Sequence, residues 1–348
     1  MRIVVTGASG NVGTAVLEAL TSDDRVDSVL GVCRRAHEWR PPRTSWVWGD
    51  VADLDLQRVF RGADVVIHLA WLFQPMRSPA VTWRSNVIGS KRVLEAVEAA
   101  SVPAVVVASS VGAYSPRRNL DPVFEDYPTD GVPQAAYSRE KAYVERLMDQ
   151  HQLRHPDRRV VRLRPGFIFQ DRAVAEQRRL FLGPFVPHAA LRPGRVPLLP
   201  LPTQLRLQAV HSTDVAAAYA AAALTPVSGA FNVAADPVLD PDALAALLQT
   251  RWRPVPAAAL RAVLATAYRA RAVPAAPELF DLLMQVPMMA TDRARHELGW
   301  KPSYDAGEAV SSFLTWDGDT SPATPPLARS TSGPLRSHEL ATGLGTRA

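Results

Sequence analysis

MRIVVTGASGNVG, residues 1–13, joins a short β-branched run to three closely spaced glycines. An apolar helical pattern follows over residues 12–20. A strand, a glycine turn and a helix in this order can hold a dinucleotide pyrophosphate at the helix N-terminus. Gly7 permits a tight turn, Gly10 lets the backbone approach the phosphates, and Gly13 lets the helix pack on the strand. The spacing is G-x-x-G-x-x-G rather than G-x-G-x-x-G, so a glycine-rich corner without a ligand is the alternative.

Short runs of Val, Ile and Leu recur after this stretch and alternate with helical patterns. The runs lack polar alternation, which is typical of strands buried on both faces of a parallel sheet. Repeated strand–helix units predict an α/β fold with a right-handed, doubly wound parallel sheet of the Rossmann type. We expect strands at residues 2–6, 28–33, 64–69, 103–109 and 159–164. We expect helices at residues 12–20, 55–61, 84–100 and 136–154.

The pattern changes after residues 164–166, which indicates a second region. Residues 1–170 are predicted to form the dinucleotide-binding domain. Residues 171–316 are predicted to form a smaller, mainly substrate-binding region with some segments returning to the core. The Pro, Ser, Thr and Gly content of residues 317–348 predicts a disordered tail. Within the second region we expect a proline-rich loop or extended cover at 183–203 and helices at 213–224, 240–250, 256–286 (one or two) and 305–314.

Composition narrows the classes of partner and compartment. The chain has 348 residues and a net charge of +5, carried by scattered arginines without a basic block, so no nucleic-acid partner is expected. Cys33 is the single cysteine, which excludes an intrachain disulfide, and no His, Asp and Glu spacing predicts a metal. The sequence shows neither a signal segment nor a long apolar run, so we expect a cytoplasmic protein without a membrane span.

Three residues of later segments have the chemistry of proton transfer. Tyr137 and Lys141 lie four apart in a helical pattern and so share one face. A lysine ammonium beside a phenol lowers the pKa of the phenol toward a useful range. Ser110 ends a buried strand at the sheet edge where ligands bind in this architecture. The alternatives are an ordinary surface pair for the first two and a turn-capping serine for the third.

An ordered series of motifs covers residues 1–316. The series is TGASGNVG (6–13), GDVAD (49–53), VIHLAW (66–71), NVIGSKRVLEA (86–96), ASSVGAY (108–114), YSREK (137–141), RLRPGFIF (162–169), VHSTDVAAAY (210–219), FNVA (231–234) and LGWKPSY (298–304). In this order the motifs resemble the extended short-chain dehydrogenases/reductases, also called the NAD-dependent epimerase/dehydratase family.

The resemblance implies a role for each matched position. Tyr137 is then the proton donor or acceptor, Lys141 lowers its pKa and binds the nicotinamide ribose, and Ser110 orients the substrate oxygen. The implied cofactor contacts come from the glycine turn, the ends of the next strands and the catalytic helix. They are Gly7, Ser9, Gly10, Asn11, Val12, Gly13, Arg34, Arg35, Asp50, Val51, Leu69, Ala70, Trp71, Ser109, Tyr137, Lys141, Pro165 and Phe167.

The end of the second strand bears on the choice of cofactor. Cys33 stands where an acidic residue would bind the ribose hydroxyls of NAD, and Arg34 and Arg35 follow it. A guanidinium there could pair with a 2′-phosphate, which favours NADP over NAD. NAD stays open, because both arginines could instead stack on adenine or face solvent.

Departures from the family pattern narrow the reaction. Val111 and Gly112 replace the Asp-Glu pair of the dehydratases, which argues against sugar dehydration. Phe167 and Leu207 stand where nucleotide-sugar epimerases carry Asn and Arg, although Arg206 is adjacent to the second position. The remaining candidate substrate region is apolar and suits a less charged ketone, aldehyde or alcohol, unless these side chains are core. It comprises Trp71, Leu72, Phe73, Trp83, Phe167, Phe169, Phe181 and Phe185.

Three functions follow as hypotheses. The first is an NAD(P)-dependent oxidoreductase that moves a hydride between nicotinamide and a small or medium carbonyl or alcohol, with Tyr137 as general acid/base. The second is a nucleotide-sugar epimerase with transient oxidation by bound NAD, and the third is a non-catalytic cofactor sensor. A homodimer through the helices at 84–100 and 136–154 is also implied, although packing on the sheet would explain the same apolar positions: Val93, Leu94, Val97, Ala142, Val144 and Leu147.

Overall fold

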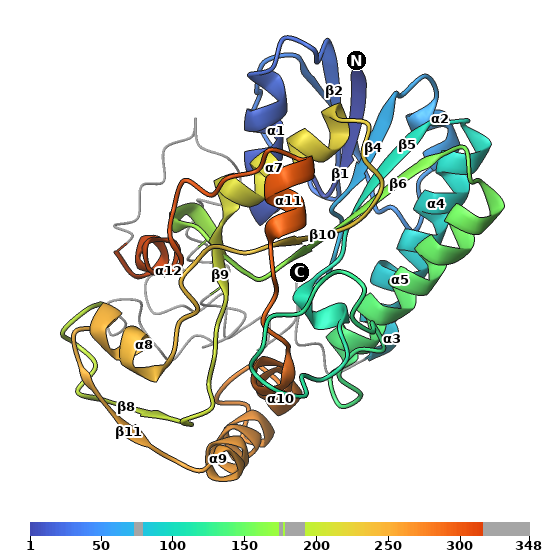
Figure 1. Ribbon diagram of the computed structural model, residues 1–348. Coiled ribbons are helices and arrows are strands. Elements are labelled where there is room, and N and C mark those ends of the chain that lie inside the picture. Colours follow the sequence, from blue (N-terminus) through green and yellow to red (C-terminus); the bar gives the residue numbers. More distant parts are fainter. Residues whose placement is uncertain (73–78, 174–176, 178–191, 316–348) are drawn as a thin grey trace.

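A seven-stranded parallel sheet forms the centre of the molecule in the computed structural model (Figure 1). The structure describes residues 1–72, 79–173, 177 and 192–315. The strand order is β10-β6-β5-β4-β1-β2-β3. The strands are β1 (Arg2–Thr6), β2 (Ser28–Cys33), β3 (Thr44–Trp48), β4 (Val65–His68), β5 (Ala104–Ala108), β6 (Arg159–Pro165) and β10 (Gly229–Val233).

β1 lies in the interior of the sheet, and the direction in which successive strands are added to the sheet reverses once. The chain runs from β1 outward to β3, then returns to β4 on the other side of β1 and continues to β6 and β10. The reversal lies between β1 and β4, where Ile3 is paired with Val65 and Thr6 with His68. In open α/β sheets a ligand binds outside the carboxyl ends of the strands at such a reversal.

Five of these strands confirm the sequence prediction and two were missed. β3 was missed because its sequence TSWVW lacks a Val, Ile and Leu run and lies half-exposed at one edge of the sheet. β10, with the sequence GAFNV, forms the opposite edge and comes from the region after residue 170. The predicted doubly wound α/β architecture is correct.

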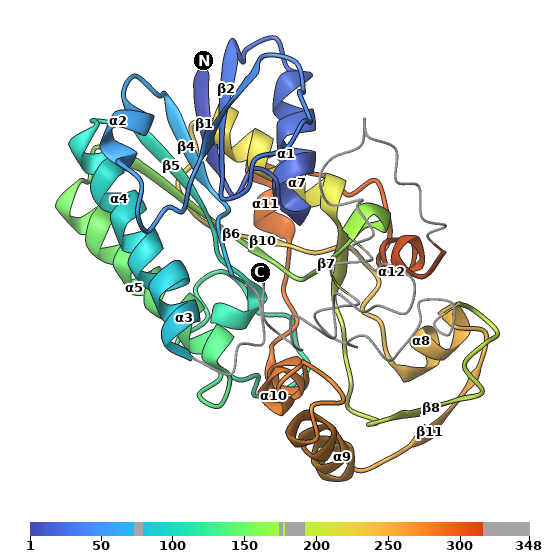
Figure 2. The same cartoon turned by 180° about the vertical axis from the view of Figure 1, so that it is seen from behind.

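Helices cover both faces of the sheet, as the two opposite views of Figures 1 and 2 show. α1 (Asn11–Thr21) and α7 (Ser212–Leu224) pack on one face, where Ile3, Ile67 and Tyr219 share a buried cluster. α2 (Leu56–Phe60), α4 (Gly89–Ala99) and α5 (Ala136–Arg154) pack on the other face. Alternate strand residues point to opposite faces, so uniformly apolar strands fill both cores.

The helix expected at 84–100 is longer and irregular. It begins as α3 (Pro79–Trp83), continues through a π-helical turn at Arg84–Ile88 and ends as α4. A π-helical turn bends the face that a helix presents and is frequent at functional sites. Here it contains Asn86, which is buried against the site described below.

The rest of the described chain forms small sheets and helices beside the carboxyl edge of the main sheet. The sequence segment 256–286, expected to form one or two helices, forms two. The elements are β7 (Phe167–Phe169), β8 (Leu198–Leu201), β9 (Ala209–His211), β11 (Arg251–Pro254), α8 (Pro241–Leu247), α9 (Ala257–Arg269), α10 (Pro277–Gln285), α11 (Asp292–Glu297) and α12 (Ala306–Thr315), with 3₁₀ turns at Val111–Ala113 and Asp171–Ala173. β7 pairs with β9, and β8 pairs with β11.

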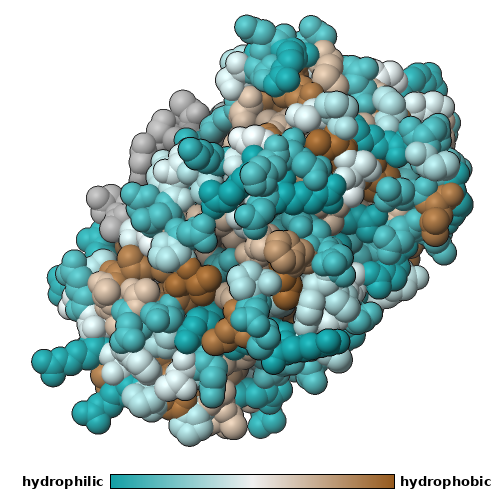
Figure 3. Space-filling view, in the orientation of Figure 1, coloured by the Kyte–Doolittle hydropathy of each residue, from teal (hydrophilic) through white to brown (hydrophobic). Residues whose placement is uncertain are grey.

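Part of the sequence prediction lies outside the described residues: the tail at 317–348, the first part of the proline-rich stretch (183–191 of 183–203), and Phe73, Phe181 and Phe185. None of the described helices combines the length and the apolar character needed to cross a membrane. On the face drawn in Figure 3, apolar surface lies in separate patches between hydrophilic side chains.

Candidate active site

The glycine turn after β1 meets the end of β4 at the reversal of strand order. Gly7 has φ +72°, and a Cβ there would lie 2.6 Å from the amide nitrogen of Ala70. A Cβ on Gly13 would lie 2.7 Å from the carbonyl carbon of Ala8. A Cβ on Gly10 would meet only the Gly7 carbonyl, at 3.2 Å, among the described atoms. Gly7 and Gly13 therefore allow close packing, whereas Gly10 leaves one side of the turn open.

The open side faces the start of α1. Gly10 is the N-cap, no described side chain caps this helix end, and the first turn carries no acidic residue. The amide groups and the positive end of the helix dipole there favour an anion. Gln170 donates to the Asn11 carbonyl at 2.9 Å and Ser212 donates to it at 3.1 Å, which fixes the turn. These residues fit the pyrophosphate of a dinucleotide.

The ends of β2 and β3 lie side by side next to this turn. The Gly49 amide donates to the Cys33 carbonyl at 3.0 Å, which joins the two strand ends. Arg34 and Arg35 are exposed there. Asp50 accepts a hydrogen bond from the Ala52 amide at 2.9 Å. Val51 is buried beneath this edge, against Gly89 at the start of α4.

Ser110, in the turn that follows β5, and Tyr137, on α5, come together. The side chains of Ser110 and Tyr137 share a hydrogen bond, and Ser110 Oγ also accepts from the Gly112 amide at 3.0 Å. A Cβ on Gly112 would lie 2.9 Å from the Tyr137 ring, so the absence of a side chain at Gly112 leaves room for the ring. Burial raises the pKa of Tyr137 to about 12, although the Ser110 hydrogen bond lowers it. Ser110 thus both caps the turn, as the alternative held, and contacts the phenol.

Lys141 lies near the phenol but is directed to other groups. Its Nζ donates to the Ala108 carbonyl at 2.7 Å and lies 3.4 Å from the centre of the Trp71 ring, against 5.9 Å from the centre of the Tyr137 ring. Burial lowers the pKa of Lys141 to about 7. The expected lowering of the Tyr137 pKa is therefore not seen in this arrangement, because burial of the phenol outweighs the Ser110 hydrogen bond and Lys141 is directed to other groups.

Trp71 connects α5 with the reversal of strand order. Its ring meets the Tyr137 ring edge to face, with centres 5.9 Å apart, and its buried Nε1 has no hydrogen-bond partner among the described residues. Leu69 and Ala70 precede it beside the glycine turn. Phe167, two residues after Pro165 at the end of β6, packs against the same apolar cluster as Tyr137.

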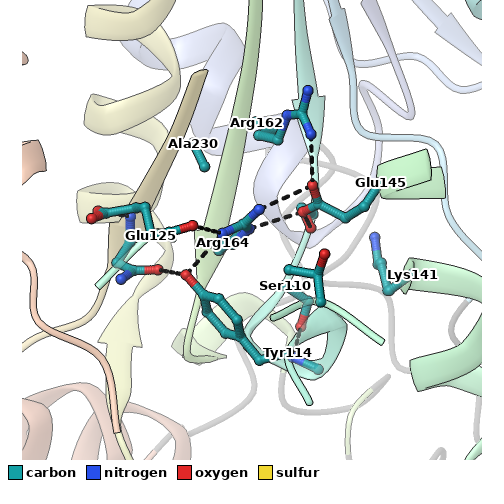
Figure 4. A network of polar contacts seen from close by, with 12 residues as sticks. Ser110, Tyr114, Glu125, Lys141, Glu145, Arg162, Arg164 and Ala230 are labelled. Atoms are coloured by element: carbon teal, nitrogen blue, oxygen red, sulfur yellow. Dashed lines mark hydrogen bonds and ion pairs between the residues drawn. The ribbon is translucent and has the colours of Figure 1, made fainter. Parts of the chain in front are cut away.

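A buried ionic network lies behind the serines and was missed at the sequence level (Figure 4). Ser109 Oγ donates to Glu145 Oε1 at 2.5 Å, and Arg164 donates to both oxygens of Glu145, at 2.9 and 3.1 Å. Arg162 also donates a hydrogen bond to Glu145 Oε2, at 3.1 Å. Burial opposes the charge of Glu145, but Arg164 and Arg162 outweigh it and lower the pKa of Glu145 to about 2.

The sequence carried a signal for this network. Glu145 follows Lys141 by one helical turn, and two arginines interrupt an otherwise apolar buried strand. Charged side chains are almost never fully buried unless paired, so each predicts a partner. The sequence does not identify the partner of each charged side chain, because the pairing depends on how α5 lies across β6.

A second buried carboxylate, Glu140, ties α5 to the π-helical turn. Thr82 donates to it at 2.6 Å and Asn86 donates at 2.7 Å. Asn86 also accepts from the Leu72 amide at 2.7 Å. Burial raises the pKa of Glu140, although the two hydrogen bonds lower it. α5, which carries Tyr137 and Lys141, is therefore fixed by the hydrogen bonds of Glu140 and by the ion pairs of Glu145.

Several aromatic residues expected around the substrate lie elsewhere. Trp83 lies on the outside of α3, with its ring centre 5.0 Å from that of Tyr143. Phe169 packs on Phe313 of α12, with centres 5.9 Å apart. Leu72 is buried in the protein. The sequence pattern did not specify the direction of these side chains, because that direction depends on packing. Of the same set, Trp71 contacts the Tyr137 ring, and Phe167 packs against the same apolar cluster as Tyr137.

Arginines from two segments lie close enough for their charges to interact. Arg117 donates to the Gln204 carbonyl at 2.9 Å, and its Nη1 is buried without a hydrogen-bond partner in the described segments. Burial and the charge of Arg206 lower the pKa of Arg117. Arg206 itself donates to the Leu205 carbonyl at 2.7 Å. The pair provides a concentration of positive charge for an anionic group.

Comparison with known sequences gives one family and two kinds of enzyme. The sequence model of the NAD dependent epimerase/dehydratase family matches residues 3–234. UDP-glucose 4-epimerase of Yersinia pestis is 30% identical over 170 residues, which cover 45% of this chain and 50% of that protein. L-arabinose 1-dehydrogenase (NAD(P)(+)) of Haloferax volcanii is 38% identical over 110 residues, which cover 31% and 41%. The chain thus spans about half the length, or less, of these curated relatives.

Comparison with solved structures gives the same architecture. UDP-glucose 4-epimerase of Thermotoga maritima superimposes with a TM-score of 0.68 at 17% identity, covering 91% of this chain and 98% of that one. MoeE5 in complex with UDP-glucose and NAD gives a TM-score of 0.65 at 19% identity, with the same coverage. At such identities the likeness establishes the fold.

Proposed function

Because the chain belongs to the NAD-dependent epimerase/dehydratase family, we propose that it is an NAD(P)-dependent oxidoreductase that reduces a small or medium carbonyl compound. The observation that carries the proposal is the meeting of Ser110, Tyr137 and Lys141 beside the open glycine turn. Residues 1–170 would provide the dinucleotide site, and residues 171–316 would provide most of the substrate site.

The state of the phenol supports the reductive direction. With a pKa of about 12, Tyr137 is protonated at neutral pH and can donate to a carbonyl oxygen. A bound nicotinamide would supply the hydride. Ser110 would donate a hydrogen bond to the same oxygen, and Trp71 and Phe167 would exclude water from it. Oxidation of an alcohol would first require the buried phenol to lose its proton, which the raised pKa opposes.

A substrate screen tests this function. The purified protein is mixed with NADPH or NADH and a panel of ketones and aldehydes, and nicotinamide absorbance is followed. We expect net consumption of the reduced cofactor with at least one uncharged carbonyl compound. Cofactor binding with no turnover on any compound would favour the non-catalytic sensor instead.

Nucleotide-sugar epimerisation is the second candidate, and Arg117 together with Arg206 favours it. Two guanidinium groups whose charges interact suit a diphosphate, and Arg206 could replace the arginine missing at Leu207. UDP-glucose would then be converted without net change in cofactor absorbance. Such conversion, with cofactor retained through purification, would replace the oxidoreductase proposal.

NADP is the proposed cofactor, with Arg34 as the contact of the 2′-phosphate. We expect Arg34→Ala to weaken NADPH binding by about 10- to 100-fold, because a hydrogen bond to a charged group contributes about 1.5–3 kcal/mol. NADH binding should change little. Titration followed by NADPH or NADH fluorescence measures both affinities. Arg58→Ala, which removes an equal charge from the exposed side of α2, is the matched control. Equal losses for both cofactors would contradict the assignment.

A homodimer is proposed through a different set of residues from those expected. Val93, Val97 and Val144 are buried in the core under α4 and α5, so they cannot form an interface. Trp83 and Tyr143 are instead exposed by 39% and 46%, in contact with each other on the outer side of α3 and α5.

We expect the double substitution Trp83→Ser with Tyr143→Ser to convert a dimer into a monomer, measured as a halved mass by light scattering. Leu153→Ser, at the far end of α5, removes a more exposed apolar side chain and should leave the mass unchanged. A wild-type protein that is monomeric at micromolar concentration would refute the interface.

A further inference from the structure

Three potential metal ligands meet at the C-terminal ends of α4 and α5. Glu98 lies in the last turn of α4, His151 lies in the last turn of α5, and His155 is the C-cap residue of α5. One ligand atom from each side chain lies within 4.8 Å of the other two. Glu98 Oε2 is 3.2 Å from His155 Nε2, and the two imidazole rings have centres 5.0 Å apart.

The two imidazoles have unused nitrogens at this place. Nε2 of His151 and Nε2 of His155 are both buried without a hydrogen-bond partner in the described chain, and His151 is only 5% exposed. The approach of Glu98 to His155 is close but does not have hydrogen-bond geometry. A buried polar atom without a partner destabilises a fold by about 1–3 kcal/mol, so native structures nearly always supply one. A cation between the three side chains would satisfy both nitrogens at once.

The donor set selects the class of cation. Two imidazoles and one carboxylate suit Zn²⁺ and the related ions Co²⁺ and Ni²⁺, whereas Mg²⁺ and Ca²⁺ prefer oxygen ligands. In a tetrahedral zinc site with bonds of about 2.0–2.1 Å, neighbouring ligand atoms lie roughly 3.3 Å apart. The separation between Glu98 and His155 already has this size, and the Glu98 side chain, which is 43% exposed, can rotate toward His151.

Two arginines near the three ligands lower the affinity of the site for a cation, although each donates hydrogen bonds to other groups. Arg158 donates to the Val97 carbonyl at 2.9 Å, and Arg154 donates to Gln150 at 3.0 Å. Their positive charge opposes a second cation nearby, and the carboxylate of Glu98 offsets part of it.

We propose that Glu98, His151 and His155 bind one Zn²⁺-class ion that joins the ends of α4 and α5, with water as the fourth ligand. The ion is structural rather than catalytic, since His151 follows Tyr137 by 14 residues along α5, or about 21 Å at 1.5 Å per residue. The sequence predicted no metal, because Glu98 and His151 are far apart in the chain and meet only when α4 packs beside α5.

Zinc binding to the untagged, full-length protein tests the proposal. After treatment with a chelator, calorimetric titration with Zn²⁺ alone should give one ion per chain, and the melting temperature should rise with Zn²⁺ concentration. Co²⁺ should give the visible absorption of a tetrahedral site. His151→Gln and His155→Gln should each weaken Zn²⁺ affinity by at least about 100-fold, more than loss of an outer partner usually does. Glu98→Gln should weaken it less.

Two controls separate this site from other zinc ligands. His296→Gln removes an exposed histidine of α11 and should leave the affinity unchanged. Cys33→Ser removes the thiol that lies 3.7 Å from His37, a competing thiol–imidazole pair. The proposal is overturned if the wild type binds less than one ion at micromolar Zn²⁺, or if binding survives the His151 and His155 substitutions. It is also overturned if Cys33→Ser abolishes binding. Melting of each variant in chelator confirms that it is folded.

Discussion

Replacement of Tyr137 by phenylalanine should lower turnover by about 10²- to 10⁴-fold, the range that a positioned acid or base usually contributes. The substitution removes one oxygen and retains the ring that packs edge to face on Trp71 and against Gly112. Cofactor affinity should therefore change by less than about threefold, since the fold of the site is preserved. The measurement is kcat with the best substrate of the carbonyl screen, together with a cofactor titration.

Tyr143→Phe is the matched control, because it makes the same chemical change on the same helix. Tyr143 lies on the exposed side of α5, in contact with Trp83. Its substitution should leave kcat unchanged. Full activity of the Tyr137 variant would show that another group transfers the proton, and the proposed mechanism would then fail.

Replacement of Glu145 by alanine should lower the free energy of unfolding by about 3–5 kcal/mol, the usual cost of removing one partner of a buried ion pair. The side chain is fully buried, and its loss leaves the guanidinium groups of Arg162 and Arg164 without their shared carboxylate. Urea unfolding followed by circular dichroism measures the change. Glu95→Ala, which breaks the exposed pair with Lys91, should change stability by less than about 1 kcal/mol. A similar small loss for both variants would contradict a stabilising network.

The same carboxylate should make the protein sensitive to acid. Because the pKa of Glu145 is lowered from 4.5 to about 2 in the folded state, its contribution is complete above pH 4.5 and is lost as the pH falls toward 2. Urea unfolding measured between these pH values should show a steeper loss of stability in the wild type than in the Glu145→Ala variant. Parallel curves would mean that other carboxylates determine acid unfolding.

The sequence predicted the strands that are buried on both faces, because such strands need uninterrupted apolar residues. It also predicted that Tyr137 and Lys141 share a face, since helical spacing alone requires this. It could not give the direction of Lys141, which depends on the Ala108 carbonyl and the Trp71 ring from two other segments. The half-exposed β3 and the outward Trp83 were missed for a related reason: their environment is set by which neighbour lies beside them.

The covering of the sheet has a consequence for synthesis of the chain. One apolar face is closed by α7, and one edge is closed by β10, which ends at Val233. A nascent chain that has left the ribosome only as far as residue 170 therefore displays uncovered valines and an unpaired strand. Such surfaces attract chaperones and aggregate when they persist. Expression of the first 170 residues as an isolated fragment should accordingly yield an insoluble product, even though they hold the whole glycine turn.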